Sequence, residues 1–248
     1  MMRILSIDIG GTHLKAAIVN SRGQLVADKV SMKTPSPCPP RVMLAALAKL
    51  VKPLPPHDRI AIGFPGVVRD GHVITAPNLG SKPWRNYPLT RQLTKLLGGP
   101  ALLINDAEMQ GLAVIKGKGL ELVLTLGTGA GTGLFRDGEI MPHMELAHHP
   151  IHNGKTYDEY LGGAALKKIG AKRWNKRVKK AIGFLHTLLN YDHLFIGGGN
   201  AQNLDFRLPR GVSRVSNIAG LEGAAALWRM AQRTKTDAAG GTSPQIQR

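Results

Sequence analysis

Cysteine, aromatic residues and long apolar runs are scarce in this chain of 248 residues, and each shortage excludes a class of protein. Cys38 is the only cysteine, so no intrachain disulfide can form, and a reducing cytoplasm is the expected location. No apolar run reaches the roughly 18 residues that span a bilayer. Met1-Met2-Arg3 leads directly into a predicted strand. We therefore expect neither a membrane protein nor a secretory signal. Aromatic residues make up 5% of the chain, so the core must consist mainly of Leu, Ile, Val and Ala.

Acidic residues are also scarce, with 16 Asp and Glu against 33 Lys and Arg and a formal net charge of +17. Such an excess favours polyanionic partners: nucleic acid, an acidic membrane surface or polyphosphate. The segment 167–180 concentrates the charge and contains no acid. Its cations are Lys167, Lys168, Lys172, Arg173, Lys176, Arg177, Lys179 and Lys180. A lysine stands at every fourth position from 168 to 180, which predicts a cationic stripe on one helix. That stripe is either a track for a polyanion or a solvated face.

Two glycine-rich segments, each between two apolar runs, are the most informative local features. The first is Ile7-Asp8-Ile9-Gly10-Gly11-Thr12-His13-Leu14, and the second covers 122–135 with four glycines between positions 127 and 133. Each predicts a strand, a tight turn and a second strand. Turn amides and glycines can surround a phosphate closely, although Gly-Gly also occurs in ordinary hairpins. Two such turns predict two similar domains that face one phosphate chain, which is the arrangement of actin-like, or ribonuclease-H-like, ATPases.

The rest of the sequence alternates apolar strand segments with helical periodicity, which predicts an α/β fold. Strands are predicted at 3–19 (a hairpin), 24–32, 59–64, 101–104, 193–196 and 212–215. Helices are predicted at 41–54, 89–97, 107–115, 155–169, 172–189 and 221–233, with Asp106 as the N-cap of the third. The first domain covers 3–105 and the second covers 106–233. The polar, glycine-rich segment 234–248 is predicted to be a disordered tail.

Five further segments, taken in their order along the chain, also resemble one known family. With the two glycine turns, the match runs from about residue 3 to about residue 228. The five segments are 61–68 with Gly63-Phe64-Pro65-Gly66, the Ala76-Pro77-Asn78-Leu79 loop with Trp84 after it, Leu103-Ile104-Asn105-Asp106-Ala107, Glu145-Leu146-Ala147-His148, and 194–200 with Gly197-Gly198-Gly199. Together with the two glycine turns, these segments resemble the sugar kinases of the ROK family (repressor, open reading frame, kinase). The resemblance implies a two-domain actin-like fold with an interdomain cleft, and a homodimer.

The resemblance also implies a hexose kinase that uses Mg²⁺ and transfers a phosphoryl group from polyphosphate or ATP to the 6-hydroxyl of glucose or mannose. Asp106 would be the general base, unless it only caps a helix. The donor would be bound by Gly10, Gly11, Thr12, Gly127, Thr128, Gly129 and Gly131, with Gly198 and Gly199 on the adenosine side. Asp8 would hold the magnesium ion through water, and Lys15 would contact the donor or face solvent. The sugar would be bound by Asn78, Asn105, Asp106, Glu145, His148 and Glu159, the last of which is otherwise a solvated helix residue.

One departure from the family narrows the resemblance. Many members carry a cysteine-rich zinc site after the Glu-x-x-His motif, but residues 148–155 contain histidines and no cysteine, so no zinc site is expected. The chain thereby resembles the zinc-free branch of polyphosphate glucokinases and glucomannokinases. Net basicity favours polyphosphate there without deciding the donor.

Two alternatives from other classes remain. A sugar-responsive regulator is the first, but the phosphate turn at Asp8 leaves no room for a preceding DNA-binding module. A basic nucleic-acid-binding protein is the second, but the few aromatic residues offer poor stacking platforms. Neither nucleic acid nor a membrane is therefore the expected partner.

Overall fold

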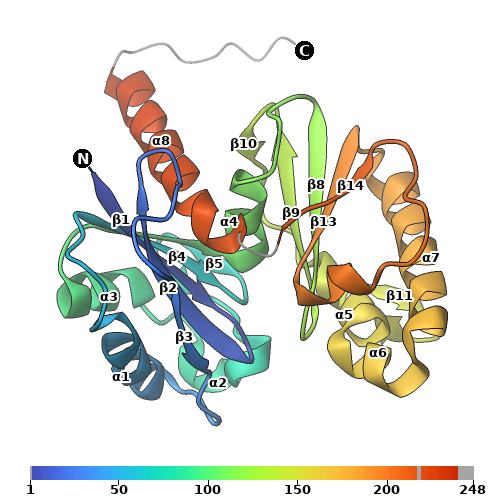
Figure 1. Ribbon diagram of the computed structural model, residues 1–248, viewed down its shortest axis with the longest axis horizontal. Coiled ribbons are helices and arrows are strands. Elements are labelled where there is room, and N and C mark those ends of the chain that lie inside the picture. Colours follow the sequence, from blue (N-terminus) through green and yellow to red (C-terminus); the bar gives the residue numbers. More distant parts are fainter. Residues whose placement is uncertain (1, 217–218, 240–248) are drawn as a thin grey trace.

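The computed structural model describes residues 2–216 and 219–239, and it contains two five-stranded sheets with helices packed on both (Figure 1). The first sheet has the strand order β3-β2-β1-β4-β7, and the second has the order β10-β9-β8-β13-β14. In each sheet an antiparallel hairpin is followed by two parallel strands. The two halves of the chain therefore repeat one topology, which confirms the predicted α/β fold and the pair of hairpins.

The first sheet contains β1 (Arg3–Ile9), β2 (His13–Asn20), β3 (Val30–Lys33), β4 (Arg59–Phe64) and β7 (Ala101–Asn105). Helices α1 (Pro40–Val51) and α3 (Leu89–Leu97) pack on its outer face and close a core of aliphatic side chains around Phe64 and Trp84. The shorter elements are β5 (Val68–Arg69), β6 (His72–Val73), the 3-10 helix η1 (Pro77–Leu79) and α2 (Ser81–Trp84).

The second sheet contains β8 (Leu120–Leu126), β9 (Ala130–Arg136), β10 (Glu139–Ile140), β13 (His193–Gly197) and β14 (Val212–Arg214). Helices α5 (Tyr157–Leu161), α6 (Gly163–Ile169) and α7 (Ala171–Leu189) enclose its separate core, at the right of Figure 1. The shorter elements are η2 (Leu146–His148), β11 (Pro150–His152), β12 (Lys155–Thr156) and η3 (Gly199–Asn203).

A third core lies between the sheets and joins them. It is built on two helices, α4 (Asp106–Leu112) and α8 (Ala219–Ala239), which pack against each other. Helix α4 contacts both sheets, and α8 returns to the first one, where the Trp228 indole donates a hydrogen bond to the Ile60 carbonyl at 3.1 Å. No helix in the part of the chain that the structure describes is long and apolar enough to cross a membrane.

Several predicted boundaries were wrong, each for a local reason. The strand expected at 24–32 begins only at Val30, since the segment before it leaves Leu25 and Val26 exposed. The helix expected at 155–169 is divided into β12, α5 and α6, with a break at Gly162. Gly170, at φ 75°, separates α6 from α7, so the lysines at every fourth position do not share one helix.

The two helices between the sheets, α4 and α8, also differ from the prediction. Asn105, not Asp106, is the N-cap of α4, which ends at Leu112. Helix α8 runs to Ala239, so residues 234–239 belong to a helix rather than to a tail, since without glycine or proline an established helix extends at little cost. Residues 240–248 lie outside the described part. Because α8 packs on the first sheet, the segment 106–233 is not confined to the second lobe, and the boundary at 105 stays a prediction.

Position 223 tests the contact between α4 and α8. A Cβ atom at Gly223 would overlap the Met109 carbonyl of α4, whereas one at Gly183 in α7 would meet nothing. Exposed Gly183→Ala should raise the free energy of unfolding by up to about 1 kcal/mol, as helix propensity dictates. Gly223→Ala should lower it by about 1–3 kcal/mol, because the packed helices must move apart. Denaturant unfolding measures both, and a stabilised Gly223→Ala protein would contradict the close contact.

Candidate active site

One cleft between the two lobes brings together nearly all residues that the sequence singled out. From the first half it is lined by Asp8, Gly10, Gly11, Thr12, Lys15, Asn78, Asn105 and Asp106. From the second half it is lined by Gly127, Thr128, Gly129, Gly131, Glu145, His148, Gly198 and Gly199. Glu159 is the one predicted site residue that does not line it.

The first phosphate turn follows β1 and is held by backbone and hydroxyl contacts. The Gly10 N–H donates to the His13 carbonyl at 3.0 Å, and the Thr34 hydroxyl donates to the Gly10 carbonyl at 2.7 Å. At Gly11 a Cβ atom would lie 3.2 Å from the Asn78 Cβ atom, so glycine allows the sugar-side loop to approach this turn.

The second phosphate turn joins β8 to β9 and is held by side chains from later in the chain. Asp158 of α5 accepts a hydrogen bond from the Ala130 N–H at 2.8 Å, and the Asn200 amide donates to the Gly127 carbonyl at 2.7 Å. A side chain at Gly129 would overlap the Asp158 carboxylate, so the turn requires glycine there. The two turns meet across the cleft, where the Thr12 and Thr128 hydroxyl oxygens are 2.7 Å apart.

Asp8 and Lys15 are paired at the wall of the cleft. They stand opposite each other on β1 and β2, and the Lys15 Nζ atom lies 3.0 Å from the Asp8 Oδ2 atom. The carboxylate is 20% exposed and the lysine side chain 37% exposed, so both remain open to a ligand. Lys15 therefore does not simply face solvent. Any contact that it makes with the phosphoryl donor would be made beside the Asp8 carboxylate.

Asp106 is the first residue of α4, and the side chain before it fixes where the helix begins. The Asn105 Oδ1 atom accepts from the N–H groups of Ala107 and Glu108, and its amide donates to the Gly66 carbonyl at 3.2 Å. Burial raises the pKa of Asp106 from 3.8 to about 7, and the negative charges of Asp8 and Glu145 act in the same direction. The hydrogen bond from Ala107 N–H opposes this shift. A carboxyl group with this pKa can gain and lose a proton near neutral pH.

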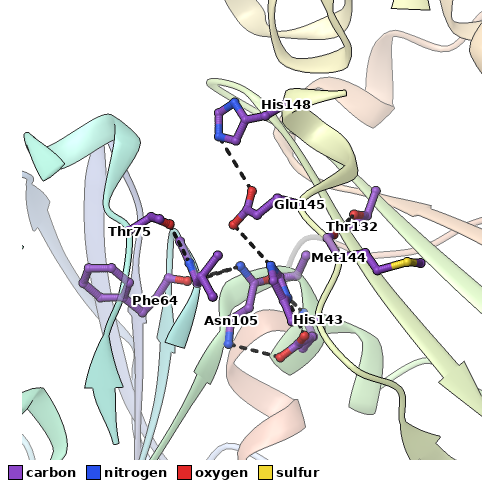
Figure 2. Close-up of polar contacts among 12 residues, drawn as sticks. Phe64, Thr75, Asn105, Thr132, His143, Met144, Glu145 and His148 are labelled. Carbon is purple, nitrogen blue, oxygen red and sulfur yellow. Dashed lines mark hydrogen bonds and ion pairs between the residues drawn. The ribbon is translucent and has the colours of Figure 1, made fainter. Parts of the chain in front are cut away.

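A chain of charged side chains leads from α4 to the far side of the cleft (Figure 2). Glu108 completes the helix cap by accepting from the Asn105 N–H at 3.3 Å, and its other oxygen lies 2.6 Å from His143 Nδ1. His143 Nε2 lies 3.2 Å from Glu145 Oε1, and Glu145 Oε2 lies 3.7 Å from His148 Nε2. Burial would lower the pKa of His143, but the hydrogen bonds and charges of Glu108 and Glu145 outweigh it and raise that pKa to about 9.

Two predicted sugar-binding residues, and Trp84 of the segment after the Asn78 loop, have structural contacts that change their interpretation. The Asn105 side chain is occupied by backbone partners, so it positions the site from beneath. Trp84 is fully buried and donates to the Cys38 carbonyl at 2.9 Å, so it belongs to the core. Glu159 is exposed and forms a reciprocal cap with Thr156 at the start of α5. This placement does not support a sugar contact by Glu159.

Four polar residues of the site were missed by sequence reasoning: Glu108, His143, Asp158 and Asn200. Glu108 had a usable signal, because Asn-x-x-Glu at a helix start is a capping box. His143 had none, since it lies in an irregular loop between β10 and η2. Within residues 2–216 and 219–239, no three His, Cys, Asp or Glu side chains converge as a metal site would require.

Comparisons with known proteins agree with this geometry. The sequence profile of the ROK family matches residues 4–152. The chain belongs to the ROK family. It is 30% identical over 236 residues to the polyphosphate glucokinase of Mycobacterium tuberculosis, a match that covers 88% of each protein.

Solved structures of ROK proteins share the fold over almost the whole length. The inorganic polyphosphate/ATP-glucomannokinase of Arthrobacter sp. strain KM has a TM-score of 0.84 and 29% identity, covering 94% of this chain and 100% of that one. A ROK glucokinase of Streptomyces griseus in complex with glucose and AMPPNP has a TM-score of 0.75 and 20% identity, covering 92% and 99%. This ROK-family chain therefore has the two-domain actin-like fold.

The raised pKa of His143 predicts a pH dependence of stability. Because its folded-state pKa of about 9 exceeds the ordinary value of 6.5, the stabilisation is complete below pH 6.5 and is lost as pH rises through about 9. The stability difference between the parent protein and His143→Asn should therefore shrink across this range, by on the order of 2 kcal/mol. Urea unfolding at several pH values measures it. The exposed His152, changed to Asn, is the control, and an equal pH trend in both variants would contradict the assignment.

Proposed function

We propose that this chain is a hexose kinase that transfers a phosphoryl group from polyphosphate or ATP to the 6-hydroxyl of glucose, with mannose as a second acceptor. The observation that carries the proposal is the single cleft in which two glycine turns meet at Thr12 and Thr128 while Asp106, Glu145 and His148 line its wall. The names of its relatives, a polyphosphate glucokinase and a polyphosphate/ATP-glucomannokinase, support the same reaction.

In this mechanism the protein mainly positions the reactants. Phosphoryl transfer requires held phosphates, neutralised charge and an aligned nucleophile. The amides and hydroxyls of the two turns hold the donor, and Asn78, Glu145 and His148 hold the sugar hydroxyls. Asp106 accepts the proton of the attacking 6-hydroxyl and orients it, which its pKa of about 7 permits near neutral pH.

Mg²⁺ is the proposed metal ion, and Asp8 would hold it through water. The carboxylate fits, because it is partly exposed to the cleft and its charge contributes to the raised pKa of Asp106. Hard oxygen ligands and retained water are the usual environment of Mg²⁺. The ion would neutralise negative charge on the donor phosphates, and Lys15 would supply a second positive charge beside it.

Asp106→Asn tests the chemical role. The substitution preserves shape but cannot accept a proton, so kcat should fall by about two to four orders of magnitude while glucose affinity changes little. In the parent protein, kcat/KM should fall as pH drops below about 7, where Asp106 becomes protonated. A coupled assay measures the rates and calorimetry measures the affinity. Turnover near the parent value would show that Asp106 is only a helix residue.

A sugar-responsive regulator without catalysis is the competing function. Asp106 favours the kinase, because sugar binding alone does not require a carboxyl group whose pKa is raised to about 7, whereas a general base near neutral pH does. Homodimerisation, inferred from the family, and a cytoplasmic location, inferred from the single cysteine, complete the proposal.

We also propose that the basic segment 167–180 extends the polyphosphate site. Helix α6 starts at the second phosphate turn, where Gly163 N–H lies 3.0 Å from both the Gly127 and Thr128 carbonyl oxygens. It spans about 10 Å and carries Lys167 and Lys168 at its far end. Helix α7 continues with exposed Lys172, Lys176 and Lys180. No ion pair in the described part of the chain involves a cation of this segment.

A salt titration tests the polyphosphate extension. Polyphosphate affinity should fall more steeply with salt than ATP affinity, because screening shortens to roughly 8 Å at physiological salt and the polymer meets more cations. Changing Lys172, Lys176 and Lys180 to Gln should weaken polyphosphate binding and flatten its salt dependence. The matched control changes exposed Lys49, Lys52 and Lys95 on the first lobe and removes the same charge. Equal effects of both triple variants would make the segment a solvated face.

A further inference from the structure

His143 and Glu108 form a largely buried pair in contact with Glu145, and no step of the proposed reaction uses either of the two. We propose that these two residues are positioning residues, which hold the Glu145 carboxylate toward the sugar and couple it to the end of α4 that carries Asp106. This inference rests on the proposed hexose binding, because the coupling acts when Glu145 accepts a sugar hydroxyl.

The geometry leaves the imidazole one orientation. Nδ1 lies 2.6 Å from Glu108 Oε1 and Nε2 lies 3.2 Å from Glu145 Oε1, so rotation of the ring would break both contacts. The His143 side chain is 16% exposed and that of Glu108 is 7% exposed, so water does not readily replace either contact. The loop is held as well, since the Thr132 hydroxyl donates to the Met144 carbonyl at 3.4 Å (Figure 2).

The same cluster reaches the base through the helix backbone. One Glu108 oxygen contacts His143, and the other accepts a hydrogen bond from the N–H of Asn105. Asn105 is the residue directly before Asp106. Displacement of Glu145 would therefore pull on the first turn of α4. A single carboxylate thus links the sugar clamp to the start of the catalytic helix.

The charges in the cluster leave one Glu145 oxygen for the sugar. His143 as an imidazolium lies between two carboxylates, with Asp106, Asp8 and His148 as the other titratable groups nearby. Its Nε2 holds Glu145 Oε1. Among residues 2–216 and 219–239, Oε2 has only His148 nearby, at 3.7 Å, beyond hydrogen-bond distance. A carboxylate oxygen without a hydrogen-bond partner is a strong acceptor for a sugar hydroxyl.

Binding measurements test the positioning role. His143→Ala and Glu108→Gln should each weaken glucose affinity by about tenfold or more, the effect of losing a buried charge-assisted hydrogen bond, and leave donor affinity within about twofold. Glu108→Gln retains a side chain that can cap α4, so it should fold. His143→Asn keeps one donor and should restore part of the affinity. The double variant should lose no more glucose affinity than the single variant that binds glucose less tightly, because both residues act through one chain of contacts.

The matched control is His149→Ala, which removes an exposed neighbouring histidine outside the cleft. Unchanged glucose affinity in folded His143→Ala and Glu108→Gln proteins, or an equal loss in the control, would overturn the positioning role. If the parent protein binds no hexose, the proposed function fails and the positioning role falls with it.

Nitrogen NMR of the sugar-free protein separates the two failures. It should show both His143 ring nitrogens protonated at neutral pH in the parent protein. In Glu108→Gln a larger fraction of His143 should be neutral, because one of the two carboxylates that stabilise the imidazolium is gone. A neutral His143 in the parent protein would overturn this inference while leaving the proposed kinase activity intact.

Discussion

The start of helix α4 is the constraint on which the whole cleft depends. The Asn105 side chain caps the helix and also donates to the Gly66 carbonyl, so it fastens α4 to the turn after β4. Because α4 is buried between the two sheets, its starting point sets where Asp106 meets the cleft. At Gly63 a Cβ atom would lie only 3.2 Å from the Asp106 Cα atom, so β4 has no room for a side chain there. The proposed base is thus placed by backbone contacts more than by bonds of its own carboxylate.

The cleft is locally acidic in a chain whose net charge is +17. Asp8, Asp106 and Glu145 line it, while Lys15 and His143 are the cations closest to them. Burial raises the pKa of Asp106, and the negative charges of Asp8 and Glu145 add to that shift. The excess of negative charge also means that donor phosphates would need turn amides and a metal ion to offset repulsion. A dense part of the basic charge lies instead on α6 and α7, where exposed lysines can attract a long anion without altering the base.

The sequence predicted the parts of the site that are fixed by local backbone chemistry. The two glycine turns lie between apolar strands, so they were found from motif and periodicity. Asp106 also follows an apolar strand, but its assignment to the site came from the resemblance to the family. The sequence could not show that Asp158, and not Glu159, contacts the site, because this depends on where α5 begins. Neighbouring residues on a helix point in different directions, so the start at Tyr157 turns Asp158 toward the phosphate turn and Glu159 toward its cap. The contact of His143 with Glu108, 35 residues away, depends on how a loop without periodicity packs on α4.

The repeated topology explains how two turns 116 residues apart in sequence come to share one hydrogen bond. Each turn joins the two strands of the hairpin in its own sheet, and the sheets face each other across α4 and α8. In the Thr12–Thr128 contact only one hydroxyl donates to the other. A phosphate between the turns would let both hydroxyls donate to anionic oxygens, which replaces one neutral bond with two charge-assisted ones. The donor would therefore join the lobes more strongly than the protein does alone, and the sugar, with Asn78 on one lobe and Glu145 on the other, would add to the same closure. Closure by both substrates would exclude water, the nucleophile that competes with the sugar hydroxyl.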